Sequence, residues 1–117
     1  YYLIIELHRD SIGKKYTTAV HEGTSYAKVA FVIGMEHANY QSNEEKAVSL
    51  QQQMEKIVPG ITRNIIRKSG SGVDGKYNQD LHPNLIVVEL GGVENTEEEL
   101  NRTIAVLAEA IPMILAK

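Results

Sequence analysis

The sequence contains no cysteine among its 117 residues. A disulfide framework and a thiolate metal site are therefore both excluded within it. It also lacks any apolar run near the length of about 20 residues that a membrane-spanning helix needs. There is no excess of positive charge either, because 12 basic and 15 acidic side chains give a formal net charge of −3. This balance argues against a dedicated nucleic-acid binder, so we expect no nucleic-acid partner.

The chain has no initiator Met and no signal peptide at its start. It opens at Tyr1, directly within an apolar stretch that predicts a buried strand over residues 1–7. Natural domains rarely begin in this way. Its length suits one modest domain and is too short for two. We therefore expect a portion of a single domain, with at least one further piece of the fold and any export signal lying upstream.

Two apolar stretches, residues 1–7 and 85–90, predict buried strands, and residues 61–68, with Ile65 and Ile66 at their apolar centre, predict a short strand. Between the first two, residues 14–33 predict a β-hairpin in which Gly23 supplies the positive φ of a tight turn. The second arm of the hairpin becomes more apolar, and we expect it to enter the central sheet and stop at Gly34. Residues 69–75 are rich in Gly and Ser and are interpreted as a mobile loop.

Two stretches show helical spacing. The first begins with a capping box of Ser42 and Glu45 and ends at Pro59-Gly60. The second begins at Asn95 or Thr96, with Glu98 or Glu99 as the capping partner, and Pro112 is expected to kink or loosen its last turn. The side chains expected to face the core are Ala47, Leu50, Met54, Ile57 and Val58 in the first helix, and Leu100, Ile104, Leu107, Ile111 and Leu115 in the second.

Strands therefore alternate with amphipathic helices, and the most apolar strands are those expected to be covered on both faces. The predicted fold class is α/β, as a three-layer α/β/α domain with a mixed, largely parallel central sheet. The hairpin would supply the antiparallel part of this mixed sheet.

Glu89 is the single carboxylate in the apolar stretch 85–90. A charge at the end of a buried strand costs several kcal/mol, as a rough figure, unless it is paired, metal-bound or protonated. In open α/β sheets the carboxyl ends of strands are also where ligands bind. Glu89 is therefore a candidate functional residue. The alternative is a glutamate that turns out into solvent at the end of its strand.

His8 follows the first strand. Because side chains alternate along a strand, His8 is expected on the same side as Glu6, and Asp10 can share that side. Such a histidine can be a metal ligand whose ring is held by a neighbouring carboxylate. A surface histidine at the end of a strand fits the same pattern. Residues 77–80 precede the central strand 85–90 and can form either a substrate-facing wall or a hydrogen-bonded turn.

Four segments, taken in order, resemble the stage II sporulation protein P family: residues 8–10, 31–34, 77–81 and 89–96. That family comprises cell-wall hydrolases of endospore-forming bacteria and is related to the zinc-dependent N-acetylmuramoyl-L-alanine amidases, with their phosphorylase/hydrolase-like fold. The resemblance implies that residues 1–117 are the C-terminal portion of a single amidase-like catalytic domain that is incomplete at its N-terminus.

The resemblance also implies the roles of particular residues. The cofactor would be Zn²⁺, held by two ligands upstream of Tyr1 and by His8 as the third, with Glu89 as the general base. Glu6, His37 and His82 match no family ligand. The residues predicted to bind substrate are Arg9, Asp10, Asn78, Gln79 and Asp80.

The implied activity is cleavage of the amide between N-acetylmuramic acid and L-alanine in peptidoglycan, during septal cell-wall degradation and engulfment. Cutting of stem-peptide cross-links is a second activity credited to the family. The implied partners are peptidoglycan and stage II sporulation proteins D and M. The full-length protein would be membrane-anchored and would act outside the cytoplasm, at the septal, forespore-engulfing membrane face. Two competing hypotheses are a catalytically inactive peptidoglycan-binding or scaffolding domain and an unrelated α/β hydrolase fragment.

Overall fold

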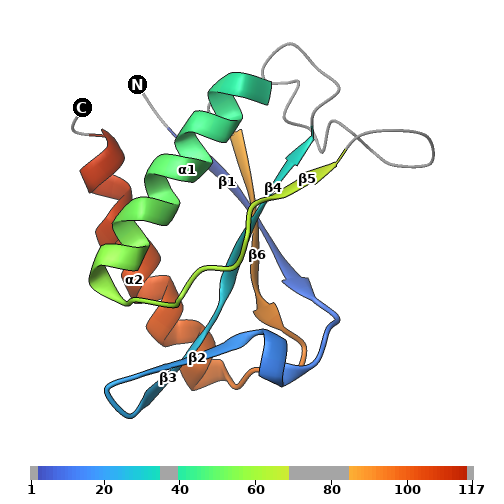
Figure 1. Ribbon diagram of the computed structural model, residues 1–117, viewed down its shortest axis with the longest axis vertical. Coiled ribbons are helices and arrows are strands. Elements are labelled where there is room, and N and C mark those ends of the chain that lie inside the picture. The colour runs from blue at the N-terminus through green and yellow to red at the C-terminus, as the bar shows by residue number, and fades with distance from the viewer. Residues whose placement is uncertain (1–2, 35–39, 69–84, 116–117) are drawn as a thin grey trace.

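The computed structural model describes residues 3–34, 40–68 and 85–115. A four-stranded sheet in the order β1-β6-β4-β5 lies at its centre, and β2 pairs with β3 in a separate two-stranded sheet (Figure 1). The strands are β1 (Ile4–Asp10), β2 (Thr18–His21), β3 (Thr24–Ala27), β4 (Val29–Gly34), β5 (Ile66–Lys68) and β6 (Leu85–Gly92). The helices are α1 (Tyr40–Ile57), α2 (Glu97–Leu115) and the short 3-10 helix η1 (Lys14–Tyr16).

The central sheet is mixed and largely parallel. β1 runs parallel to β6 and β4 runs parallel to β5, whereas β4 and β6 are antiparallel. Every residue of β6 is buried except Glu89, which is half-buried. The predicted α/β class, the mixed sheet and the central place of strand 85–90 are therefore confirmed.

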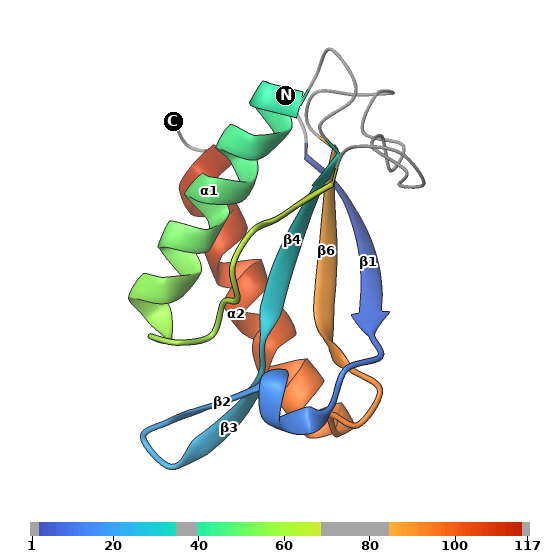
Figure 2. The ribbon, with the colours of Figure 1, turned by 45° about the vertical axis from the view of Figure 1, so that its right-hand side comes forward.

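Both helices pack on one face of the sheet (Figure 2). The core lies between them and that face, and it is filled by side chains such as Phe31, Leu50, Ile86 and Val88. Because side chains alternate along a strand, the neighbours of these residues point the other way. We call that side the helix-free face, since neither α1 nor α2 packs on it. It carries Glu6, His8, Lys28, Ala30, Val32, Val87 and Glu89. The described residues thus supply two of the three predicted layers.

β1 differs from its prediction. It continues through His8 and Arg9 to Asp10, because the backbone goes on pairing with β6 beyond the apolar stretch. Within the described residues β6 is its only partner, so β1 lies at the edge of the sheet. Ile4 is 38% exposed and Leu7 is 52% exposed. The prediction of a strand buried on both faces was therefore wrong for β1.

The hairpin is confirmed. Its turn is formed by Glu22 and Gly23, which have φ angles of 51° and 78°, as a tight two-residue turn between antiparallel strands requires. The chain then leaves β3 and enters the central sheet as β4, which ends at Gly34 as predicted. β5 is shorter than the predicted strand, because only residues 66–68 pair regularly. Upstream of them, Thr62 makes one isolated bridge to Val29.

The predicted start of α1 was wrong by three residues, since the helix begins at Tyr40 and not at Asn43, directly after Ser42. Its apolar stripe is confirmed, with Ala47, Leu50, Met54 and Val58 buried. Ile57 is partly buried against the same core. The described helices contain no segment that is long and apolar enough to cross a membrane.

The start of α2 is a reciprocal capping box, as predicted. The Glu99 N–H donates to Thr96 Oγ1 at 3.1 Å, and the Thr96 N–H donates to Glu99 Oε1 at 3.0 Å. The predicted apolar stripe was wrong at Ile104, which is 42% exposed. Thr103 turns inward instead, because its hydroxyl donates to the Ala27 carbonyl at 2.7 Å. The helix continues past Pro112 to Leu115.

Candidate functional site

His8 and Glu89 are paired neighbours in adjacent strands. They are register partners in the parallel pairing of β1 with β6, and strands paired in this way lie about 4.8 Å apart. Register partners point to the same face of a sheet, so both side chains lie on the helix-free face. The pairing brings together the two residues that the sequence singled out for catalysis and metal binding.

Glu89 is half-buried, and its carboxylate makes no contact that stabilises the fold within the described residues. It faces Ala30 on β4, whose small side chain leaves room above the sheet. Its carboxylate forms no hydrogen bond or ion pair with any other residue that the structure describes, although the residue is half-buried. Glu89 lies inside β6, three positions before the end of the strand, and not at the strand end as predicted. Its backbone is therefore fixed within the sheet, and its carboxylate has no partner among the described residues.

The imidazole of His8 lies beside a carboxylate on its own strand. Nε2 of His8 is 3.4 Å from Oε1 of Glu6, and the two side chains are 49% and 37% exposed. A carboxylate in this position can orient a metal-ligating histidine. His8 is accessible from solvent, so its ring can contact a group that comes from outside the described residues.

The described residues supply only part of what a zinc site needs. A catalytic zinc takes three protein ligands and keeps one open position. Within residues 3–34, 40–68 and 85–115 no group of three His, Cys, Asp or Glu side chains is placed to hold a metal ion. His8 fits the role of one exposed nitrogen ligand beside Glu89, and the remaining ligands of such a site would come from elsewhere.

Arg9 and Asp10, predicted to bind substrate, both contact the protein itself. Nη2 of Arg9 donates to the carbonyl oxygens of Gly92 at 2.8 Å and Asn95 at 3.2 Å. Asp10 accepts hydrogen bonds from the N–H groups of Ser11 and Ile12 and from the Arg63 guanidinium. Burial alone would raise the pKa of Asp10, but these hydrogen bonds and the Arg63 charge outweigh it and lower the pKa.

The other predicted substrate-binding residues, Asn78, Gln79 and Asp80, lie outside the described residues. So do His37 and His82. The substrate-facing wall predicted for residues 77–80 therefore stays a prediction, and Arg9 and Asp10 are the two predicted substrate-binding residues whose surroundings are known.

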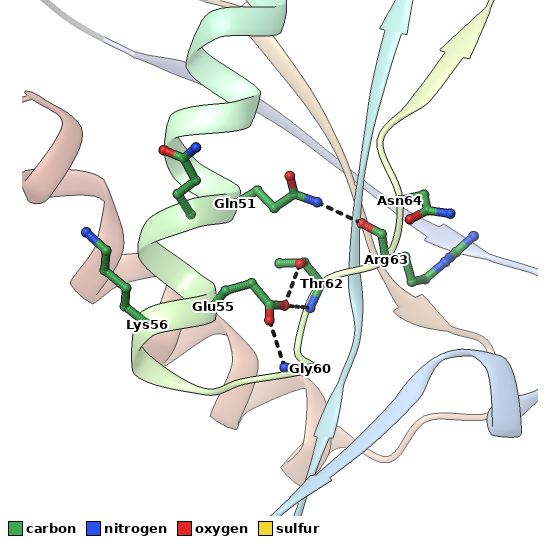
Figure 3. Close-up of a pocket in the computed structure, with 8 residues that line it drawn as sticks. Gln51, Glu55, Lys56, Gly60, Thr62, Arg63 and Asn64 are labelled. Atoms are coloured by element: carbon green, nitrogen blue, oxygen red, sulfur yellow. Dashed lines mark hydrogen bonds between the residues drawn. The ribbon is translucent and has the colours of Figure 1, made fainter.

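A polar cavity of about 520 Å³ lies on the helix side of the sheet, between α1 and the segment before β5 (Figure 3). Its carboxylate, Glu55, accepts hydrogen bonds from the N–H groups of Gly60 and Thr62 and from the Thr62 hydroxyl. Burial raises the pKa of Glu55, but the hydrogen bonds from Thr62 and Gly60 and the charge of Lys28 lower it. Glu55 is thus occupied in holding the chain turn after α1.

A second cavity, of about 470 Å³, lies near the carboxyl end of β1 and is lined by Ile12, Tyr16, Lys28, Thr62, Arg63, Asn64 and Ile66. Sequence reasoning missed it, because its residues come from three separate segments. The one available signal was the alternation of Lys28, Ala30 and Val32, which places Lys28 on the face of the sheet that carries Glu89.

Comparison with known proteins gives one family. The family model described as stage II sporulation protein P matches residues 1–112. Stage II sporulation protein P of Bacillus subtilis (strain 168) is 46% identical over 99 residues, which cover 85% of this chain and 25% of that protein. The chain thus spans about a quarter of the length of this curated relative. No solved structure matches the chain.

Proposed function

Because the chain belongs to the stage II sporulation protein P family, which acts in sporulation, we propose that it forms part of a peptidoglycan amidase. The bond cleaved is the amide between the lactyl group of N-acetylmuramic acid and L-alanine. The observation that carries this proposal is the pairing of His8 with Glu89 on the helix-free face.

Glu89 is the general base in this proposal. A general base must present an accessible carboxylate at a fixed position, and Glu89 projects from the central strand of the sheet with no partner among the described residues. It takes a proton from the attacking water, whose oxygen adds to the amide carbonyl carbon. When the carbon–nitrogen bond breaks, Glu89 returns that proton to the nitrogen, which leaves as the amine of L-alanine.

His8 is proposed as one ligand of a zinc ion, with its other ligands outside this chain. Zinc bound there would polarise the amide carbonyl and make water acidic enough to lose a proton near neutral pH. Glu6, whose Oε1 lies 3.4 Å from Nε2 of His8, would orient the imidazole. The β1–β6 pairing then sets the distance between the ligand and the base without any loop.

The setting of the reaction is also proposed. A protein of this activity acts outside the cytoplasm, at the septal membrane that engulfs the forespore, and is anchored there by parts outside this chain. Peptidoglycan is its substrate, and stage II sporulation proteins D and M are its proposed partners. Cleavage of stem-peptide cross-links at the same site is a second proposed reaction.

The test uses the full-length protein with purified peptidoglycan, with products identified by mass spectrometry. We expect release of stem peptides with a free L-alanine amine, and loss of this release when a zinc chelator is added. A folded, zinc-loaded protein that binds peptidoglycan in a pull-down but releases no product would favour the alternative, a catalytically inactive binding or scaffolding domain.

A further inference from the structure

The cavity near the carboxyl end of β1 opens on the same face of the sheet as Glu89. Lys28 immediately precedes β4, and its side chain alternates with that of Val29, which faces the helices. Ile66 pairs with Val32 and therefore shares the helix-free face. Arg63 reaches over this face to Asp10 on β1, with Nη1 and Oδ2 at 3.0 Å.

The charges of this cavity are unevenly satisfied. The charge of Arg63 is matched by Asp10, yet only one N–H of its guanidinium is used in that contact. Lys28 is half-buried and forms no ion pair or side-chain hydrogen bond with the described part of the chain. Glu55 is the carboxylate that feels its charge, but both Glu55 oxygens already accept hydrogen bonds from Gly60 or Thr62.

The cavity therefore presents hydrogen-bond donors, and none of its described lining residues is an aspartate or glutamate that could neutralise them. Lys28, Arg63, Asn64 and Tyr16 all line it, and each of these side chains can donate a hydrogen bond. Ile12 and Ile66 add apolar surface, which lowers the local dielectric and strengthens a charge-assisted hydrogen bond. Although the chain as a whole has a formal net charge of −3, the charge of this cavity is locally positive. The arrangement suits an anion with planar oxygens, such as a carboxylate.

The position of the cavity relative to Glu89 suits an extended peptide. Ala30 is the residue of β4 that faces Glu89. Lys28 lies two residues before it, which is one step along the same face, about 7 Å. An extended peptide covers that distance in about two residues. A peptide whose reacting amide lies over Glu89 can thus place a carboxylate from a neighbouring residue in the cavity.

We propose that Lys28 and Arg63 form a subsite that binds a carboxylate on the peptide side of the scissile amide. The proposal rests on the peptidoglycan amidase function and names the part of the substrate that this chain recognises. Lys28 supplies the unpaired charge, and Arg63, held by Asp10, supplies directed N–H donors. The subsite sets which stem peptides bind, whereas Glu89 acts on the bond that is cut.

The experiment measures binding to the full-length protein by calorimetry. The probes are a purified stem peptide with free carboxylates and the same peptide with its carboxylates amidated. The variant is Lys28→Met, which removes the charge and keeps an unbranched side chain. The matched control is Lys56→Met, because Lys56 is exposed on α1 and lines the cavity on the other side of the sheet.

We expect Lys28→Met to weaken binding of the free-carboxylate peptide about tenfold, the size expected when a charge-assisted hydrogen bond is lost. Its affinity for the amidated peptide should stay equal to that of the unmodified protein, and Lys56→Met should change neither. Equal affinity of the unmodified protein for the two peptides would overturn the proposal. So would the absence of measurable binding of the free-carboxylate peptide.

Binding and turnover separate this proposal from the proposed function. Loss of binding in Lys28→Met, in a protein that releases no peptide from peptidoglycan, would support the carboxylate subsite and contradict the amidase. Release of peptides at the same rate from free-carboxylate and amidated substrates, in both the unmodified protein and Lys28→Met, would support the amidase and contradict the subsite.

Discussion

Arg63 donates a hydrogen bond from Nη1 to Oδ2 of Asp10 at 3.0 Å, although the two residues are 53 positions apart in the sequence. Their side chains are only 18% and 19% exposed. The pair joins the segment before β5 to the end of β1, directly beside the strand positions of His8 and Glu89.

Asp10→Ala is expected to destabilise the protein by about 2 kcal/mol, because it leaves the partly buried Arg63 charge without its partner and frees two backbone N–H groups. The matched control is Glu44→Ala, which breaks the more exposed pair of Glu44 and Arg67 at 2.9 Å. That change should cost less than about 1 kcal/mol. Chemical denaturation of both variants measures the difference, and equal losses would show that burial of the Arg63 pair adds nothing.

Glu89→Gln is expected to lower peptidoglycan turnover by about 10³-fold, since an amide cannot accept the proton of the attacking water. The fold should persist, because Glu89 bonds to no described residue. Glu98→Gln, at an exposed position in the first turn of α2, is the control and should retain full activity. Turnover of Glu89→Gln within a few-fold of the unmodified protein would remove Glu89 from the mechanism.

Glu99 should make stability depend on pH in the acid range. Burial would raise its pKa, but hydrogen bonds from Thr96, Asn95, Ser25 and Lys14 lower it from 4.5 to about 2. Because the pKa of the folded state lies below that of the unfolded chain, the stabilising contribution is present above pH 4.5. This contribution is lost as the pH falls from about 4.5 towards 2, and we expect the loss in free energy of unfolding to be about 2–3 kcal/mol.

The comparison with Glu99→Gln isolates this effect from the other carboxylates. A glutamine keeps a carbonyl oxygen for the capping box but does not titrate. The free energy of unfolding of Glu99→Gln should therefore fall less steeply between pH 5 and 2 than that of the unmodified protein. Glu98→Gln should show the full dependence. Parallel curves for all three proteins would contradict the assignment.

Gly91→Ala is expected to cost about 3 kcal/mol or more in stability, through the left-handed backbone and steric overlap together. Gly91 has φ of 60°, and an added Cβ would lie 2.7 Å from Asn95 Oδ1 and 2.8 Å from Ala27 Cβ. Gly23→Ala is the control, since its φ is 78° but no atom lies within 4 Å of the added Cβ. Its cost should stay near 1 kcal/mol. Thermal unfolding of the two variants measures the contrast.

The central strand and the hairpin could be predicted because their signals are local. An uninterrupted apolar run marks a strand covered on both faces, and β6 is such a strand. Gly23 marks a turn whatever surrounds it. The capping box of α2 is equally local, because Thr96 and Glu99 satisfy one another within one helical turn.

The errors came from features that depend on distant segments. The run at the start of the chain has the same composition as a buried strand, but only the position of β1 in the sheet order decides how much of it is covered. Ile104 was expected inside and lies outside, because Thr103 bonds to the backbone of β3 and turns the helix. No spacing in the sequence of α2 reveals an acceptor on another element.

The candidate site was predictable in its members and not in its geometry. Glu89 stood out as the one carboxylate in an apolar run and His8 as a histidine just after another, but their pairing follows from the register between two strands. Lys28 gave only the weak signal of strand alternation, because an isolated lysine before a strand is common on protein surfaces. Its meaning depends on Arg63 and on the cavity that the two residues line.

The order of strands in the sheet has a consequence for how the molecule forms. Arg9 and Gly92, which are in contact, lie 83 positions apart in the sequence, and β6 lies between β1 and β4. Neither neighbour of β6 can reach its final partner until the chain has been made past Gly92. Contacts of this sequence separation form slowly, since a long loop must close first. A chain that ends before β6 therefore has His8 without Glu89, so the two halves of the proposed catalytic pair meet only after β6 has been made.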